Sequence, residues 1–109
     1  MNKKILVVDN HPVILTYMEN LIGKEGHQVK TAKDGLTALD ILITYIPHVI
    51  FIDLVMPNID GVQLCRIIQK MPALNNTYKV ILSATIAEEA KDFSELGADA
   101  FIVKGPFNQ

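Results

Sequence analysis

Two kinds of hydrophobic pattern alternate along this chain and restrict what it can fold into. Short uninterrupted apolar runs occur at 5–8, 48–52, 80–82 and 100–103, with a weaker run at 27–32. Solid runs of this length are typical of strands that are buried on both faces of a parallel sheet. Between them, apolar residues recur at the spacing of one face of a helix. The pattern predicts the order β-α-β-α-β-α-β-α-β.

The local signals at the ends of the expected helices agree with this order. Pro12 suits the first turn of a helix, and Asp34 and Asp60 can each cap a helix start. Gly26 and Gly97 lie where helices should end. The apolar stripes of the four expected helices span Val13–Ile22, Leu36–Ile46, Leu64–Met71 and, more loosely, Ile86–Leu96. Right-handed crossovers then give a doubly wound α/β fold with a five-stranded parallel sheet.

Composition limits the class of protein. The chain has 109 residues, half of them hydrophobic, which fits one domain with a real core. The net charge of −2 gives no overall attraction to nucleic acid or to acidic membranes. A single cysteine, Cys65, fits a reducing compartment, and no apolar run approaches the ~20 residues of a membrane span. We expect a cytoplasmic domain that binds neither membrane nor nucleic acid directly.

Polar side chains follow four of the five expected strands. Asp9 and Asn10 come after the first strand, Asp53 after the third, Ser83 after the fourth and Lys104 after the fifth. Open α/β sheets bind their ligands at this carboxyl edge. Carboxylate and amide oxygens suit Mg²⁺, while a hydroxyl and an ammonium suit phosphoryl oxygens. The set therefore indicates phosphoryl transfer.

The segment "DLVMPNIDG", which begins at Asp53, resembles the phosphoacceptor motif of response regulator receiver domains in two-component systems. The resemblance extends from Lys3 to Pro106, with Ser83 and Lys104 at the expected strand ends. It implies a flavodoxin-like sheet of order 2-1-3-4-5 in which the last helix is missing or truncated. It also implies that Asp53 accepts a phosphoryl group from a sensor histidine kinase or a phosphotransfer domain.

The resemblance further implies a Mg²⁺ site and a switch. The implied metal-binding groups are Asp9 (through water), Asn10, Asp53 and the backbone carbonyl of Val55. Ser83 and Lys104 would bind the phosphoryl oxygens. Ser83 and Phe101 would move on phosphorylation and change the surface around the fourth helix and the fifth strand.

Each of these residues also has a simpler interpretation. Asp9 could be a turn or cap, Ser83 could bond its own backbone, Lys104 could be a solvated charge and Phe101 could be core. His11 is expected to be an exposed polar residue at a helix start. The coincidence of polar groups at one edge, together with the motif at Asp53, favours the receiver assignment.

Three features depart from the family pattern. Asn10 replaces a second acid, so the site lacks one charge and should bind Mg²⁺ weakly. Gly105 separates Lys104 from Pro106, whereas receivers usually place proline directly after the lysine. Only five residues follow Lys104, so the usual fifth helix is absent. Without that helix, an apolar part of the sheet face beside the first helix is left uncovered. We expect a single receiver domain over 1–109, from the N-terminal part of a longer protein or paired with a second receiver.

Two other functions stay open at this point. A degenerate receiver that acts as a binding module without phosphorylation would fit Asn10 and Gly105. A phosphohydrolase that forms an aspartyl phosphate would need an acid where this chain has Val55. No Gly-x-Gly-x-x-Gly follows a strand, which argues against a dinucleotide enzyme.

Overall fold

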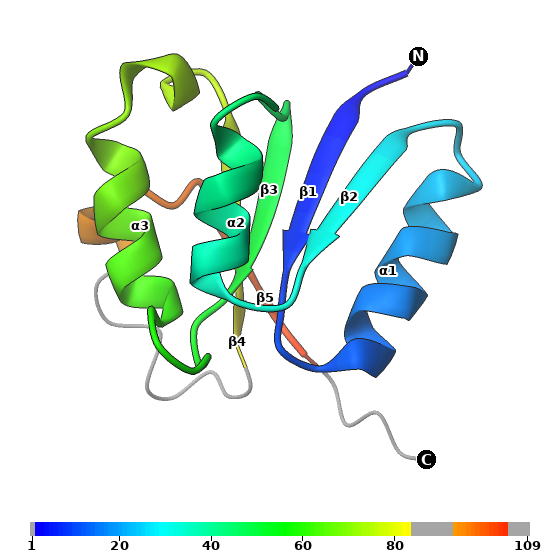
Figure 1. Cartoon of the computed structure of the whole chain (residues 1–109), viewed down its shortest axis with the longest axis horizontal. Helices are drawn as coiled ribbons and strands as arrows, with labels where there is room; N and C mark the ends of the chain where they lie inside the picture. Colours follow the sequence, from blue (N-terminus) through cyan, green and yellow to red (C-terminus); the bar gives the residue numbers. More distant parts are fainter. Residues whose placement is uncertain (1, 84–92, 105–109) are drawn as a thin grey trace.

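The sheet has the predicted order and direction. The computed structural model describes residues 2–83 and 93–104. Its strands, all parallel, run in the order β2-β1-β3-β4-β5 (Figure 1). They are β1 (Lys4–Val8), β2 (Gln28–Ala32), β3 (Val49–Asp53), β4 (Tyr78–Ser83) and β5 (Ala100–Val103). The prediction of a doubly wound, flavodoxin-like sheet is confirmed.

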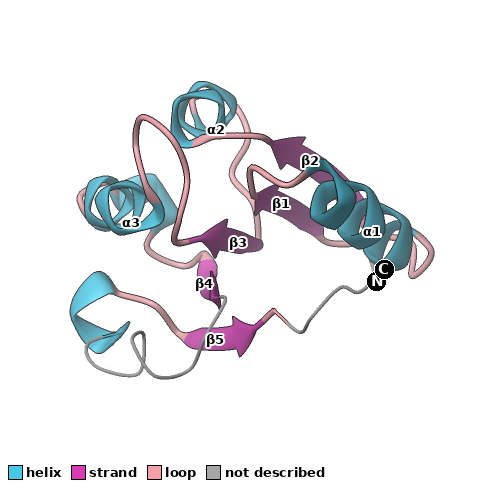
Figure 2. Cartoon of the chain, turned by 90° about the horizontal axis from the view of Figure 1, so that it is seen from below, coloured by secondary structure: helices cyan, strands magenta, loops and turns pink. Residues whose placement is uncertain are grey.

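Helices cover both faces of this sheet. They are α1 (Pro12–Gly23), α2 (Gly35–Leu42) and α3 (Gly61–Gln69), with short 3-10 helices η1 (Pro72–Leu74) and η2 (Phe93–Leu96). Figure 2 shows α2 and α3 on one face of the sheet and α1 on the other. The predicted fourth helix falls mostly on residues 84–92, which lie outside the described residues, and its last part is η2. The expectations for Gly105 and for a missing last helix fall on 105–109, also outside that part.

The predicted helix starts at Pro12, Asp34 and Asp60 are confirmed. Pro12 is the first residue of α1. The Asp34 carboxylate accepts a hydrogen bond from the Thr37 backbone N–H at 2.8 Å, and that of Asp60 accepts one from Gln63 as half of a capping box. Both caps satisfy backbone donors that a helix start leaves open.

The core lies mainly between the sheet and the α2–α3 layer. Leu6, Ile50, Ile52 and Leu64 are among its fully buried side chains. Cys65 belongs to it as predicted, and burial raises the pKa of its thiol to about 11. No helix of the described residues is long and apolar enough to cross a membrane.

The other side of the molecule is less covered. In β5, Phe101 and Ile102 are 41% and 48% exposed. The expectation that every solid apolar run is buried on both faces is therefore wrong for β5, because it is an edge strand with β4 as its neighbour. On α1, Val13 and Leu21 are also exposed.

Two of the three histidines hold the opposite, amino-terminal edge of the sheet. His27 Nδ1 accepts a hydrogen bond from the Lys3 backbone N–H at 3.1 Å. His48 Nδ1 accepts one from the Lys4 backbone N–H at 2.9 Å. Both rings precede a strand and tie it to the entry of β1, which gives them a structural role far from the carboxyl edge.

Candidate functional site

Two carboxylates meet at the carboxyl edge because β1 and β3 are parallel neighbours. Val8 pairs with Ile52, so the chain places Asp9 and Asp53 next to each other at the point where both strands end. Both residues are buried, with 0% of Asp9 and 2% of Asp53 exposed. Two negative charges in a buried setting require a nearby cation.

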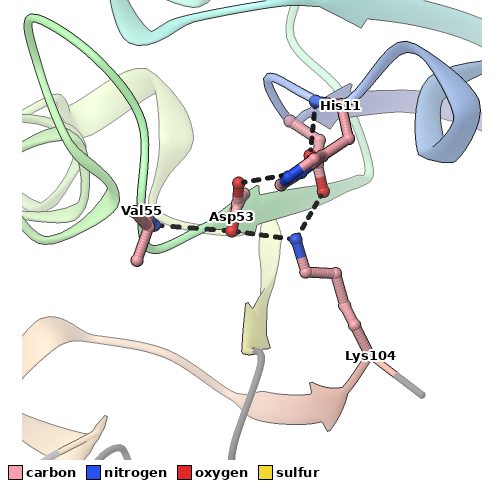
Figure 3. A network of polar contacts seen from close by, with 5 residues as sticks. His11, Asp53, Val55 and Lys104 are labelled. Atoms are coloured by element: carbon pink, nitrogen blue, oxygen red, sulfur yellow. Dashed lines mark hydrogen bonds and ion pairs between the residues drawn. The ribbon is translucent and has the colours of Figure 1, made fainter. Parts of the chain in front are cut away.

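Lys104 supplies that cation from the end of β5. Its Nζ lies 3.2 Å from Asp9 Oδ2 and 3.2 Å from Asp53 Oδ1, so one ammonium joins both carboxylates (Figure 3). The Lys104 side chain is 12% exposed. Its backbone N–H donates to the carbonyl oxygen of Ser83 at 2.6 Å, which fixes the start of the side chain beside the end of β4.

The two oxygens of Asp9 have different partners. Oδ2 faces Lys104, whereas Oδ1 accepts a hydrogen bond from the His11 backbone N–H at 2.9 Å. The ring Nδ1 of His11 lies 2.8 Å from the same Oδ1 and acts as the donor, because an ionised carboxylate can only accept. Asp9 is thus held by a charged group and by two hydrogen bonds from the turn that follows it.

Asp53 is less well satisfied. Its Oδ1 accepts from Lys104 and, at 3.4 Å, from the backbone N–H of Val55. Its Oδ2 is buried without a hydrogen-bond partner in the described part of the chain, and His11 Nδ1 is 4.0 Å away. Burial, and then the charge of Asp9, raise the pKa of Asp53, while Lys104 opposes the rise.

The start of α3 packs tightly against the end of β3. The Gly61 N–H donates to the carbonyl oxygen of Leu54 at 2.9 Å. A Cβ added at Gly61 would collide with the carbonyl oxygen of Asp53 and lie 2.5 Å from the Cα of Leu54. Glycine is needed here because two backbone segments approach closely, and this contact positions Asp53.

Of the residues predicted for the site, Asp9, Asp53 and Lys104 come into contact. Ser83 is buried at the end of β4, paired with Val103 and next to the base of Lys104. Asn10 is exposed beside Asp9, and the Val55 side chain points outward while its backbone N–H reaches Asp53. The predicted switch residue Phe101 lies further back on β5, in register with Ile81.

His11 makes a contact at this edge that sequence reasoning missed. Its side chain is 59% exposed at the start of a helix, as expected, but its ring also turns toward both carboxylates (Figure 3). The available signal was its place two positions after Asp9 and directly before Pro12. That signal is weak, because a helix N-cap is commonly polar whatever its function.

The arrangement has the donors of a cation site. Asp9, His11 and Asp53 each offer one ligand atom, and these atoms lie within 4.8 Å of one another. The set fits a divalent cation because it includes two buried carboxylates, and one of them has an oxygen without a hydrogen-bond partner among the described residues. Beside it, Lys104 provides a fixed positive charge for an anionic group.

Comparison with known proteins identifies the family of this chain. The family model for the response regulator receiver domain matches residues 5–109. The chain belongs to this family. Receiver domains are the signalling domains of two-component systems, and the predicted resemblance is confirmed.

Two curated relatives of this receiver domain are proteins of Bacillus subtilis. It is 36% identical to the alkaline phosphatase synthesis transcriptional regulatory protein PhoP, over 99% of this chain and 44% of that protein. It is 33% identical to sporulation initiation phosphotransferase F, over 99% of this chain and 86% of that protein. The receiver domain thus spans less than half of the first relative and most of the second.

Solved structures agree with the fold. The receiver domain is similar to the response regulator TrrA of Thermotoga maritima, which was crystallised in complex with Mg²⁺ and BeF. The two share 29% sequence identity with a TM-score of 0.83, over 97% of this chain and 89% of that one.

Proposed function

We propose that this receiver domain takes a phosphoryl group onto Asp53 from the phosphohistidine of a sensor kinase or a phosphotransfer protein. The observation that supports it most is the pairing of a buried, partly unsatisfied Asp53 with Asp9 and Lys104 at one edge. A relative with 33% identity is named sporulation initiation phosphotransferase F, which is consistent with transfer of a phosphoryl group.

The transfer uses the two oxygens of Asp53 differently. Oδ1 lies 3.2 Å from Lys104 Nζ, so we assign this oxygen to the new bond with phosphorus. As the O–P bond forms, the P–N bond to the donor imidazole breaks and its electron pair stays on the ring nitrogen. Lys104 then offsets negative charge on the phosphoryl oxygens, and the Ser83 hydroxyl supplies a further contact.

A Mg²⁺ ion is part of this proposal. The residues that would hold it are Asp9, Asp53 through Oδ2, Asn10 and the backbone carbonyl of Val55. When bound, the ion would supply positive charge that neutralises the transferring group. TrrA, whose structure contains Mg²⁺ and BeF, makes the same cofactor reasonable here.

The output follows from the added charge. A phosphoryl group adds roughly one to two negative charges beside two carboxylates. Ser83 closing on that group and Phe101, now 41% exposed, turning inward would change the surface along β5. A partner that binds this altered surface, including a second receiver, would read the signal.

Intact-mass spectrometry after incubation with acetyl phosphate and Mg²⁺ tests the proposal. We expect one phosphoryl adduct on the wild-type domain and none on Asp53→Asn. Asp40→Asn is the matched control, because Asp40 is an exposed carboxylate on α2. It should be labelled like the wild type.

Two results would contradict the proposal. An adduct that persists on Asp53→Asn would place the phosphoryl group elsewhere. A folded wild-type domain that takes no phosphoryl group from acetyl phosphate or from phosphoramidate would support a binding module instead.

A further inference from the structure

We infer that His11 is a metal ligand of this site, and that its imidazole shifts the site's preference from Mg²⁺ toward borderline transition-metal ions such as Co²⁺ or Zn²⁺. The inference deepens the proposed function, since it concerns the cation site next to Asp53. It rests on the position of one ring nitrogen between two carboxylate oxygens that Lys104 leaves available.

Lys104 and His11 face different oxygens of the two carboxylates. The Lys104 ammonium contacts Asp9 Oδ2 and Asp53 Oδ1. The remaining oxygens, Asp9 Oδ1 and Asp53 Oδ2, lie 2.8 Å and 4.0 Å from His11 Nδ1 (Figure 3). Asp53 Oδ2 is buried without a hydrogen-bond partner in the described residues, so it is an acceptor that a cation would satisfy.

Two of the three donor spacings match those of ligands on one ion, and the three atoms lie within 4.8 Å of one another. Ligands about 2.1 Å from a metal lie roughly 3.0 Å apart in adjacent octahedral positions and roughly 4.2 Å apart in opposite ones. The two distances from Nδ1, 2.8 Å and 4.0 Å, fall near these values. An ion among the three atoms would replace the hydrogen bond between Nδ1 and Asp9, with the ring proton then on Nε2.

The backbone holds His11 in this position. It is the N-cap of α1 with φ −98° and ψ 112°, the extended conformation favoured before proline, and Pro12 follows it. Its N–H is bonded to Asp9 Oδ1, the same oxygen that the ring faces. A ligand that is anchored through its own backbone loses little freedom when the ion binds.

The consequence for metal preference follows from donor chemistry. Mg²⁺ prefers oxygen ligands and charge, whereas imidazole nitrogen suits the later transition metals. With Asn10 in place of an acid, the site has two carboxylates, and a nitrogen donor stands beside them. The missing carboxylate at Asn10 weakens Mg²⁺ binding, and the imidazole nitrogen of His11 strengthens Co²⁺ binding.

Isothermal titration of the phosphate-free domain with MgCl₂ and with CoCl₂, in a buffer that does not bind metals, tests the inference. The variants are His11→Ala and His11→Asn, of which the second keeps a hydrogen-bond donor for Asp9. His27→Ala is the matched control, because the His27 ring serves the opposite edge of the sheet. We expect both His11 variants to lose at least about tenfold in Co²⁺ affinity, with little change for Mg²⁺, and the control to match the wild type.

Proton NMR of the Co²⁺-loaded wild type provides a second readout. A paramagnetically shifted imidazole N–H signal that is present in the wild type and in His27→Ala, and absent from His11→Asn, supports ligation by His11. An unchanged ratio of Co²⁺ to Mg²⁺ affinity in both His11 variants would overturn it. If the affinity ratio is unchanged but Asp53 is still labelled by acetyl phosphate with Mg²⁺, the proposed function holds without the metal inference. If labelling fails but the ratio of Co²⁺ to Mg²⁺ affinity falls in the His11 variants, the metal inference holds without the proposed function.

Discussion

The neighbouring strands β1 and β3 each have an aspartate at their carboxyl end, yet the two carboxylates are held differently. Asp9 is completely buried and receives two hydrogen bonds from His11 in addition to Lys104. Asp53 is almost as buried and also contacts Lys104, but its one backbone hydrogen bond, from Val55, is long at 3.4 Å. Its Oδ2 has no hydrogen bond in the part of the chain that the structure describes. The main chain behind Asp53 is in turn packed against Gly61.

The difference separates two tasks. A fully bonded carboxylate is a stable fixed charge, whereas a poorly bonded one is ready for a new partner. Asp9 therefore suits the role of a fixed charge beside the site, whereas Asp53 can take new partners, which in the proposed function are a phosphoryl group on Oδ1 and a cation on Oδ2. The four predictions below test this contrast, from the largest expected effect to the smallest.

The largest effect is expected from Gly61→Ala. The new methyl group meets the backbone at the end of β3, which cannot move aside as a flexible side chain could. We expect a loss of about 3 kcal/mol in the free energy of unfolding, measured with urea, in spite of the better helix propensity of alanine. Gly23→Ala on α1, where no atom lies within 4 Å of the new Cβ, is the control and should be neutral or stabilising. Similar unfolding midpoints for the two variants would contradict the importance of the close packing between Gly61 and the end of β3.

The two carboxylates should respond to neutralisation with opposite signs. Asp9→Asn weakens the bonds to His11 and Lys104, so we expect a loss of about 1–3 kcal/mol in stability. Asp53→Asn removes a buried charge whose environment raises its pKa, so we expect the free energy of unfolding to rise. Urea unfolding in the presence of a chelator measures both. A change of the same sign in the two variants would show that the ends of β1 and β3 are equivalent.

Adding a charge beside Asp9 should sharpen the contrast by strengthening the cation site. Asn10→Asp supplies a third carboxylate, and we expect Mg²⁺ affinity to rise about tenfold, or roughly 1.4 kcal/mol. Asn20→Asp adds the same charge at an exposed position of α1 and is the matched control. Equal Mg²⁺ titrations for Asn10→Asp and the wild type would contradict the idea that Asn10 weakens the site.

The smallest effect concerns pH. Because the pKa of Asp53 is raised in the fold, the folded domain binds this proton more tightly than the unfolded chain, so stability falls as pH rises from about 4 through the raised pKa. The excess stability of Asp53→Asn over the wild type should grow across this range and then level off.

Asp34 provides the comparison of opposite sign. The Thr37 backbone hydrogen bond lowers the pKa of this helix cap, so its contribution to stability is present at neutral pH and is lost as pH falls. Urea unfolding of wild type, Asp53→Asn and Asp34→Asn over this pH range measures both. A difference between Asp53→Asn and the wild type that does not change with pH would contradict the raised pKa.

Much of this could be predicted from sequence, because the relevant signals are local. The hydrophobic patterns predicted the succession of strands and helices along the chain, and the caps at Asp34 and Asp60 marked helix starts that the structure confirms. The meeting of Asp9, Asp53 and Lys104 followed from one topological fact, that parallel strands end at the same edge.

What the sequence could not provide depends on orientation and on neighbours. The His11 ring is oriented toward Asp9 and Asp53 by the hydrogen bond of its backbone N–H and by the conformation that Pro12 imposes on it. No rule of sequence spacing predicts this orientation. The unequal bonding of the two carboxylates depends on which oxygen faces Lys104. The exposure of β5 depends on its place at the edge of the sheet, which an apolar run does not reveal.

The ammonium of Lys104 also has a consequence for how the chain folds. Its contact with Asp9 joins residues 95 positions apart. A contact of such separation closes nearly the whole chain into one loop and requires β3, β4 and β5 to be in place first. The acidic pair thus receives its counter-charge only in the finished sheet. A nascent chain that lacks β5 would carry Asp9 and Asp53 without that counter-charge.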